Sequence, residues 1–178
     1  MSEVITVDFF EVVKTRQSLR AFQDRLIDPD QLQQILDTIN RAPSAGNLQA
    51  YEVYLVTNRD VIQVLARSTS GQDFITQSPL ALVFCAHPAR SIQKYGQRGA
   101  MLYCVQDATI ACAYAQLAVT ALGLASVWVG AFDEEAVRAA VGVGHDLRPV
   151  AFLPIGYAAE TPERRSRRAL AELVHRVE

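Results

Sequence analysis

Hydrophobic residues recur at helical spacing in three stretches of the chain. Residues 7–13 carry apolar side chains at this spacing and predict a short amphipathic helix. Asp28 followed by Pro29 supplies an N-cap and a first-turn proline, so a second helix is expected to begin there and to end near Arg41. Residues 107–122 follow a helical pattern but are apolar on nearly every side. This third helix is therefore expected to be buried centrally or at a subunit contact.

Four segments have the composition of β-strands. Residues 51–57 alternate and are rich in β-forming side chains, whereas residues 80–86 form a continuous apolar run of strand length. The second of these segments is expected to be fully buried. Residues 125–129 and 150–156 predict two further strands. Strands that interleave with helices predict a layered architecture of the mixed α+β or the α/β kind.

Shorter elements are expected between and after these segments. Residues 61–66 predict a short helix, and another helix is expected to start at Asp133. Residues 68–77 are expected to form a loop, and apolar residues within 170–174 have helical spacing near the end of the chain. The chain contains no internal repeat, low-complexity tract or interdomain linker. We therefore expect residues 1–178 to form a single domain.

The composition is that of a globular protein with a substantial core. Of the 178 residues, 50% are hydrophobic and 20% are charged, and the formal net charge is -2. This balance argues against broad electrostatic binding of nucleic acid or of an anionic membrane. The chain has no uninterrupted apolar run of membrane-spanning length, and its first residues lack the features of a signal peptide. We therefore expect a cytoplasmic protein with neither nucleic acid nor membrane as a partner.

The three cysteines are widely spaced in the sequence. Cys85, Cys104 and Cys112 lie in apolar runs and are predicted to be reduced thiols in the core. The alternative is a redox or nucleophilic thiol, which requires a polar or electropositive neighbourhood. Only Cys104, three residues after Met101, is ambiguous in this respect.

Familiar catalytic motifs are missing from the sequence. It contains no Gly-x-Gly-x-x-Gly, no Walker loop, no Gly-x-Ser-x-Gly and no pair of histidines at metal-ligand spacing. His87, His145 and His175 are far apart in sequence and are interpreted as surface or edge residues. The sequence therefore offers little support for catalysis by side chains, and it predicts no metal site.

Arginines cluster near both ends of the chain. The first group is Arg16-Gln-Ser18-Leu-Arg20, and the second is the run 164–168, which contains four arginines. A guanidinium donates two parallel hydrogen bonds with full charge to a phosphate, and a serine hydroxyl can complete the shell. Both groups are therefore candidate phosphate-binding segments. The alternative is a solvated charged turn together with a basic tail.

Residues 42–49, which read Ala-Pro-Ser-Ala-Gly-Asn-Leu-Gln, follow the second predicted helix. Their small side chains permit close approach of the backbone, and each of the two carboxamides is both a donor and an acceptor. These properties suit a loop that grips a flat heteroaromatic ring. An ordinary turn is the alternative interpretation.

These segments, taken in order, resemble the nitroreductase family. The resemblance rests on residues 16–20 and 42–49, on Trp128-Val-Gly-Ala-Phe-Asp, on Leu153-Pro-Ile-Gly-Tyr and on the arginine-rich tail. It runs from about residue 9 to residue 176, and the first two segments are its most specific part. The resemblance implies an α+β fold with a central, mostly antiparallel sheet flanked by helices. It also implies an intertwined homodimer with two FMN molecules at the interface, each contacted by both chains.

The resemblance further implies which residues contact the flavin. The first arginine group would face the phosphate, the ribityl chain or the pyrimidine edge, and tail arginines would reach the phosphate. Residues 43–47 would touch the flavin of the partner subunit, and a backbone N–H within residues 129–131 would face flavin N5. Gln72, in the loop 71–73, is a candidate contact of the pyrimidine. The implied flavin-binding residues are Arg16, Ser18, Arg20, Pro43, Ser44, Ala45, Asn47, Gln72, Val129, Gly130, Ala131, Arg165 and Arg167.

The chain departs from the family pattern at two points. Family members often have a proline and then an aromatic residue after the glutamine of the second segment, whereas this chain reads Gln49-Ala50-Tyr51. Longer members carry a segment after the central helix that shapes the substrate pocket, and 178 residues leave little room for it. In the tail, Arg164 and Arg168 remain alternatives to Arg165 and Arg167.

The function implied by the resemblance is that of an FMN-dependent oxidoreductase. Electrons would pass from NADH or NADPH through flavin N5 to a small acceptor such as a nitroaromatic, a quinone or a flavin. No catalytic side chain is needed, and Arg20 is the expected cation near flavin N1 and O2. One alternative is an enzyme of the same fold with other flavin chemistry, such as reductive dehalogenation. A non-catalytic flavin-binding or nucleotide-binding module is the other.

Overall fold

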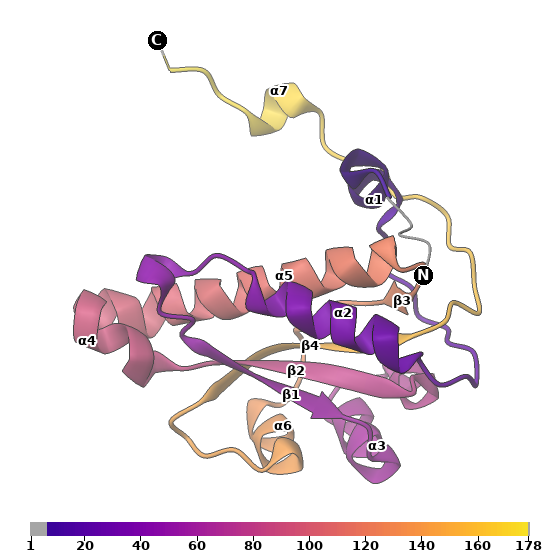
Figure 1. The fold of residues 1–178 in the computed structure, drawn as a ribbon, viewed down its shortest axis with the longest axis horizontal. Helices are drawn as coiled ribbons and strands as arrows, with labels where there is room; N and C mark the ends of the chain where they lie inside the picture. Colours follow the sequence, from indigo (N-terminus) through magenta and orange to yellow (C-terminus); the bar gives the residue numbers. More distant parts are fainter. Residues whose placement is uncertain (1–6, 178) are drawn as a thin grey trace.

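An antiparallel sheet of four strands forms the centre of the computed structural model, which describes residues 7–177 (Figure 1). The strands β1 (Tyr51–Val56), β2 (Leu80–Ala86), β3 (Ala125–Ser126) and β4 (Arg148–Gly156) lie in the order β1-β2-β4-β3. Every neighbouring pair is antiparallel. This pairing confirms the α+β alternative, because an α/β fold would contain parallel strands.

Helices cover both faces of the sheet. The helices α2 (Pro29–Asn40) and α5 (Cys104–Ala121) pack on one face, and α3 (Arg59–Arg67) and α6 (Glu134–Val141) lie on the other (Figure 1). The predicted N-cap of α2 is confirmed, since the carboxylate of Asp28 accepts a backbone N–H at 2.8 Å, and Asp133 caps α6 in the same way at 2.9 Å. The α5 helix is the most deeply buried of these four, as its apolar circumference predicts.

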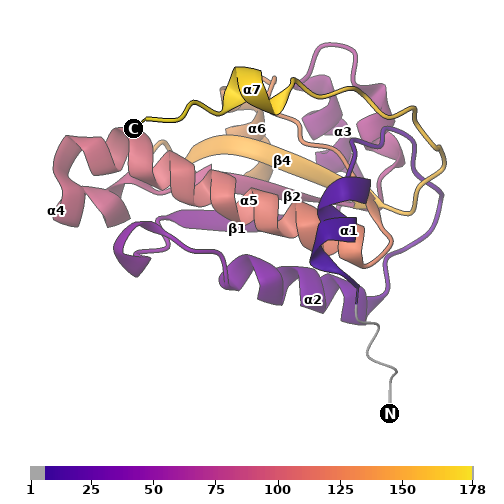
Figure 2. The ribbon, with the colours of Figure 1, turned by 90° about the horizontal axis from the view of Figure 1, so that it is seen from above.

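The helices α4 (Pro88–Arg98) and α1 (Phe9–Thr15) lie at the two ends of α5 (Figure 1). The helix α4 continues through the π-helix η3 (Gly99–Tyr103) into the first residue of α5. Near the other end of α5 lies α1, and the tail with α7 (Leu170–Leu173) extends away from the sheet (Figures 1 and 2). No helix among residues 7–177 combines the length and the apolar character that crossing a membrane requires.

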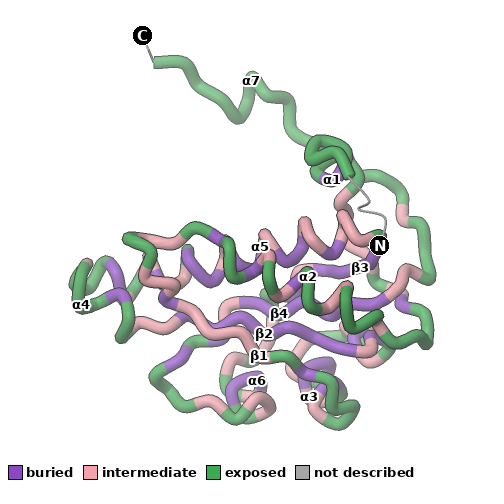
Figure 3. The backbone as a smooth tube through the Cα atoms, in the orientation of Figure 1, coloured by how far each residue is buried: buried purple, intermediate pink, exposed green. Residues whose placement is uncertain are grey.

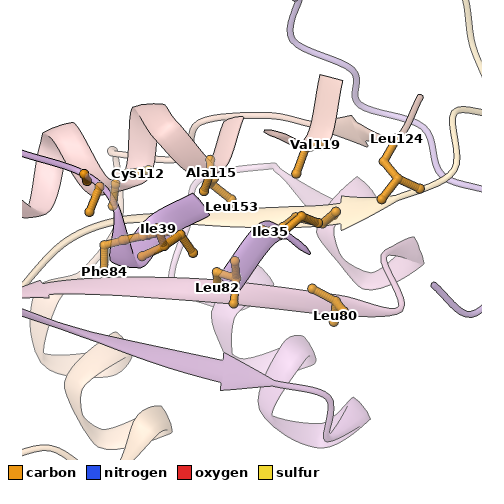
Figure 4. Packing of buried hydrophobic residues seen from close by; sticks show 14 residues of the cluster. Ile35, Ile39, Leu80, Leu82, Phe84, Cys112, Ala115, Val119, Leu124 and Leu153 are labelled. Carbon is orange, nitrogen blue, oxygen red and sulfur yellow. The ribbon is translucent and has the colours of Figure 1, made fainter. Parts of the chain in front are cut away.

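Two hydrophobic clusters sandwich the sheet. Leu82, Phe84 and Leu153 pack against Ile35 and Ile39 of α2 and against α5, and all of these side chains are buried (Figure 4). On the opposite face, a second cluster joins the sheet to α3 and α6, and it contains Ile62, Leu65, Val83, Val137 and Phe152. Residues 80–85 of β2 alternate between the two clusters. This explains why β2 is buried along its whole length, as its continuous apolar sequence predicts (Figure 3).

Several local predictions differ from the structure. The third strand stops at Ser126 rather than residue 129, because beyond it only Val129 forms an isolated bridge, to Phe152. The predicted loop 68–77 contains a 3-10 helix, η2 (Asp73–Gln77). The sequence also did not predict α4 and η3, and the predicted tail helix is a single turn. Short helices of this kind depend on tertiary contacts more than on hydrophobic periodicity.

The cysteines are buried thiols, as predicted. All three are free and have no exposed surface. Desolvation raises the pKa of Cys85 from its ordinary value of 9.0 to about 12, and it also raises the pKa of Cys104 and Cys112. The thiols therefore stay protonated at neutral pH, which contradicts the alternative of a reactive thiolate at Cys104.

The raised pKa of Cys85 predicts a loss of stability in alkaline solution. Above pH 9 the unfolded chain releases this proton while the folded chain keeps it, so the free energy of unfolding falls as the pH rises toward 12. Cys85 alone contributes up to about 1.4 kcal/mol per pH unit. We expect Cys85→Ala to flatten this dependence in urea titrations at a series of pH values. Equal slopes for the variant and the parent protein would contradict this linkage.

Candidate functional site

The two arginine groups lie side by side although they are far apart in sequence. Residues 20–23 run antiparallel to residues 157–160, which follow β4. The N–H of Gln23 donates to the carbonyl of Tyr157, and the N–H of Ala159 donates to the carbonyl of Ala21, both at 2.9 Å. This pairing brings the first arginine group to the base of the tail.

An open groove of about 1160 Å³ separates the two groups. Its lining includes the candidate residues Arg16, Ser18, Arg20, Arg165 and Arg167, together with Arg164. Within residues 7–177, none of these guanidinium groups forms an ion pair with a carboxylate. In contrast, Arg168 pairs with Glu172 at 3.8 Å and lies outside the groove lining. The groove therefore gathers five arginines without an ion-pair partner among the described residues, beside a single carboxylate, that of Glu163, and this excess of positive charge suits an anion such as a phosphate.

The loop after α2 is held by a buried carboxylate. Asp107 of α5 is 1% exposed and accepts the N–H groups of Ala45 at 2.9 Å and Ala50 at 3.3 Å. Inside the loop, the Ser44 hydroxyl accepts the N–H of Gln49 at 3.0 Å. The sequence interpretation missed Asp107, although an acidic residue within an apolar helix was the available signal. The carboxylate fixes both ends of a loop whose middle is the 3-10 helix η1 (Ala45–Asn47).

The backbone of this loop is strained. Gly46, Asn47 and Gln49 have φ values of +58°, +59° and +47°, in the left-handed region that residues other than glycine rarely adopt. Such conformations cost free energy and persist only where surrounding contacts impose them. Pro43, Gly46 and Asn47 are exposed. The loop therefore presents a rigid surface to whatever binds there, which is more than an ordinary turn provides.

The groove and the loop lie at opposite ends of α5. The loop is bound to Asp107, in the first turn of the helix. At the other end, the N–H of Leu19 donates to the carbonyl of Ser126 in β3, shortly after Leu122 caps α5. Leu122 lies fifteen positions after Asp107, so the two sites are roughly 20 Å apart along the helix. A single chain therefore does not bring residues 43–47 to the arginine groove.

The third candidate segment, residues 129–131, crosses the edge of β4. The N–H of Val129 donates to the carbonyl of Phe152 at 3.0 Å, whereas Gly130 and Ala131 are exposed. Gly130 also lines a smaller hollow of about 260 Å³ beside Glu134 and Arg148. These two side chains pair at 2.9 Å. This hydrogen bond from Arg148 lowers the pKa of Glu134.

The other candidates from the sequence lie elsewhere. Gln72 is half-buried in the turn before η2 and lines neither the groove nor the smaller hollow. His87 contacts Glu52 at 3.1 Å, and His145 and His175 are exposed. Within the described part of the chain, no group of three metal-ligating side chains is close enough to hold an ion.

Comparison with known proteins identifies the family. The model of the nitroreductase family matches residues 13–72 and 62–157. The chain belongs to the nitroreductase family. The two matches include the first arginine group, the loop 43–47 and residues 129–131, but Arg165 and Arg167 lie beyond them.

Individual relatives support this membership. The chain is 29% identical over 164 residues to a putative NADH dehydrogenase/NAD(P)H nitroreductase of Methanothermobacter thermautotrophicus, covering 90% of this chain and 82% of the relative. It is 27% identical to an FMN reductase [NAD(P)H] of Bacillus subtilis, covering 88% and 70%. A solved nitroreductase family protein of Clostridium difficile 630 has a TM-score of 0.83 at 29% identity, covering 95% and 98%. The nitroreductase fold implied by the sequence is therefore confirmed, whereas the contacts of the candidate residues with a flavin stay a prediction.

The role of Asp107 in holding the loop of this nitroreductase family protein can be tested by substitution. In Asp107→Asn, one of the two loop N–H groups would meet an amide NH₂ instead of an oxygen. We expect the free energy of unfolding to fall by about 1–3 kcal/mol in urea titrations. Hydrogen exchange at the Ala45 and Ala50 amides should also become faster.

Asp24→Asn is the matched control, because Asp24 is exposed and the same change there should leave stability within about 0.5 kcal/mol. If hydrogen exchange at the Ala45 and Ala50 amides were no faster in Asp107→Asn than in the control, Asp107 would not hold the loop.

Proposed function

We propose that this protein is an FMN-dependent oxidoreductase that takes a hydride from NADH or NADPH and passes electrons to a small acceptor. The unpaired guanidinium groups that line one groove from both ends of the chain carry the proposal. Relatives support it by name, including the FMN reductase [NAD(P)H] of Bacillus subtilis and an oxygen-insensitive NADPH nitroreductase of Salmonella typhimurium. Nitroaromatics, quinones and flavins are the acceptor classes that we propose.

The groove fits the anionic end of FMN. We infer that Arg16, Ser18, Arg165 and Arg167 hold the phosphate, because they line one space and the three arginines have no carboxylate partner among residues 7–177. The side chain of Arg20 is exposed, while its backbone N–H donates to the carboxylate of Glu160. Its guanidinium would lie at the pyrimidine edge. There a positive charge favours the reduced ring, since reduction adds negative charge.

The residues 129–131 offer a donor for flavin N5. Because the N–H of Val129 is already bonded to Phe152, the donor would be the N–H of Gly130 or Ala131. When bound, FMN supplies the redox chemistry by accepting a hydride and releasing electrons to the acceptor. The chain then needs only to bind, orient and polarise the cofactor. No reactive thiolate is required of the three cysteines, whose pKa values burial raises.

A homodimer would complete the site. The loop 43–47 and the groove lie at opposite ends of α5 in one chain, whereas a two-fold partner can bring its loop to the groove of the first chain. Apolar surface for such an interface is exposed at both ends of the chain. Phe9 and Phe10 of α1 are 60% and 75% exposed, and Leu170 and Leu173 of α7 are 75% and 58% exposed.

The first test of this function is the visible spectrum of the purified protein. We expect the absorption band of oxidised flavin, its bleaching by anaerobic NADH or NADPH, and steady turnover with a quinone or a nitroaromatic. Arg20→Ala should weaken FMN binding about tenfold or more and lower the flavin reduction potential. Arg67→Gln, an exposed charge loss on α3, is the matched control.

Each result has a distinct meaning. A protein that neither contains nor binds FMN would refute the proposal and leave the arginines as solvated surface. Flavin without turnover would favour the non-catalytic module. An unchanged potential in Arg20→Ala would remove only the role of that residue.

The shared site predicts complementation between variants. Arg16→Ala/Arg20→Ala damages the groove, and Pro43→Glu places a bulky anion on the loop, so each variant alone should bind FMN weakly. A purified mixed dimer of the two should regain about half of the parent binding capacity, because one of its two sites then has an intact groove and an intact loop. Absence of recovery in a mixed dimer that sediments as two chains would contradict the shared site.

A further inference from the structure

A cluster of aromatic and cationic side chains forms the tip of α4 and η3. We define the tip cluster as Lys94, Tyr95, Arg98 and Tyr103. The two tyrosine rings pack edge to face with centroids 5.1 Å apart. The Nζ of Lys94 lies 5.4 Å from the ring centroid of Tyr95, and the Nε of Arg98 donates to the hydroxyl of Tyr103 at 3.1 Å.

The backbone imposes this arrangement. Gly96 has φ +58° and ψ -150°, a conformation that favours glycine and that breaks α4 between Tyr95 and Arg98. Gly99 then lies so close to α4 that a Cβ there would come within 2.8 Å of the Ser91 hydroxyl. A one-turn π-helix follows, and such helices are frequent at functional sites. The tip is thus a folded projection with a defined surface.

The tip cluster lies against the strained loop. A Cβ at Gly46 would be 2.4 Å from the Tyr95 hydroxyl and 2.6 Å from the Nζ of Lys94. Earlier in α4, the Nε of Arg90 also donates to this loop, at the carbonyl of Leu48, 3.3 Å away. The tip cluster therefore borders the loop that, under the proposed function, touches the flavin of the partner subunit.

The charge of α4 is unusual for this chain. The helix contains Arg90, Lys94 and Arg98 but no acidic residue, in a protein of net charge -2. Arg90 lies 3.7 Å from a carboxylate oxygen of Glu52. The side chains of Lys94 and Arg98 are exposed and have no carboxylate partner within the described residues. Two cations without a carboxylate partner, each lying against a tyrosine ring, match a ligand that is both anionic and aromatic.

We propose that the tip cluster binds the phosphate-bearing part of the dinucleotide donor, outside the flavin site itself. This inference rests on the proposed function, which makes NADH or NADPH a substrate. The dinucleotide carries a charged pyrophosphate and an adenine ring, whereas quinones and nitroaromatics offer no phosphate for Lys94 and Arg98. The phosphates pair with the two cations, and the tyrosine rings provide apolar surface for the adenine.

The test compares donors with and without phosphates. In Lys94→Gln/Arg98→Gln, anaerobic reduction of the bound flavin is followed with NADH, with NADPH and with N-benzyl-dihydronicotinamide, which carries the reactive ring but no phosphate. We expect the apparent Kd for both dinucleotides to rise tenfold or more. The rate with the benzyl donor should match that of the parent protein, and added salt should weaken dinucleotide binding less in the variant.

Two controls accompany this comparison. Lys94→Arg/Arg98→Lys keeps both charges and should retain dinucleotide binding within a few fold. Arg67→Gln removes an exposed cation from α3, on the opposite face of the sheet, and should change neither donor.

The remaining outcomes overturn the inference. An equal loss with the benzyl donor and the dinucleotides would show that the tip only supports the flavin loop, and unchanged binding of all donors would show that it binds none. If the parent protein holds no flavin, or if no donor reduces it, the proposed function itself fails. These failures are distinguishable, because the benzyl donor reports on the flavin without requiring the tip.

Discussion

Burial of β2 on both faces is the constraint on which the rest of the fold depends. Its seven residues are all apolar and buried, and successive side chains enter opposite hydrophobic clusters. Each face therefore requires a helical layer, which α2 and α5 provide on one side and α3 and α6 on the other. The antiparallel neighbours β1 and β4 complete the backbone hydrogen bonds of this strand.

The burial of α5 follows from the same constraint and explains where the candidate sites lie. Because the helix is apolar nearly all round, a charged group inside it must have hydrogen-bond partners. Asp107 finds them in the backbone of the strained loop, so the core of the protein shapes a surface at one end of the helix. The pairing of residues 20–23 with 157–160 collects the arginines near the other end. The length of α5 thus separates two surfaces that the proposed dimer would reunite.

In the part of the chain that the structure describes, cations without a carboxylate partner gather at two places on this weakly acidic protein. Unpaired cations occur in the groove between the chain ends and on the tip beside the loop. Elsewhere some cations are paired with carboxylates, as in Arg148 with Glu134 and Arg168 with Glu172. A protein that handles a phosphorylated cofactor and a phosphorylated donor would have use for both free sets. The proposed function and the further inference therefore draw on one electrostatic pattern at two places.

Hydrophobic periodicity in the sequence predicted α1, α2, α5 and the approximate strands, because burial of one face or two leaves a direct record in residue order. The acidic start at Asp133 predicted α6. Side-chain chemistry made the arginine groups and residues 42–49 candidates, and the resemblance to the nitroreductase family implied that they contact a flavin. Tertiary structure alone decided that α4 and η3 form a folded tip, that Asp107 holds the loop, and that β3 ends at Ser126. These features depend on contacts between segments distant in sequence and on special backbone angles. Such contacts and angles leave no periodic signal in the order of apolar and polar residues.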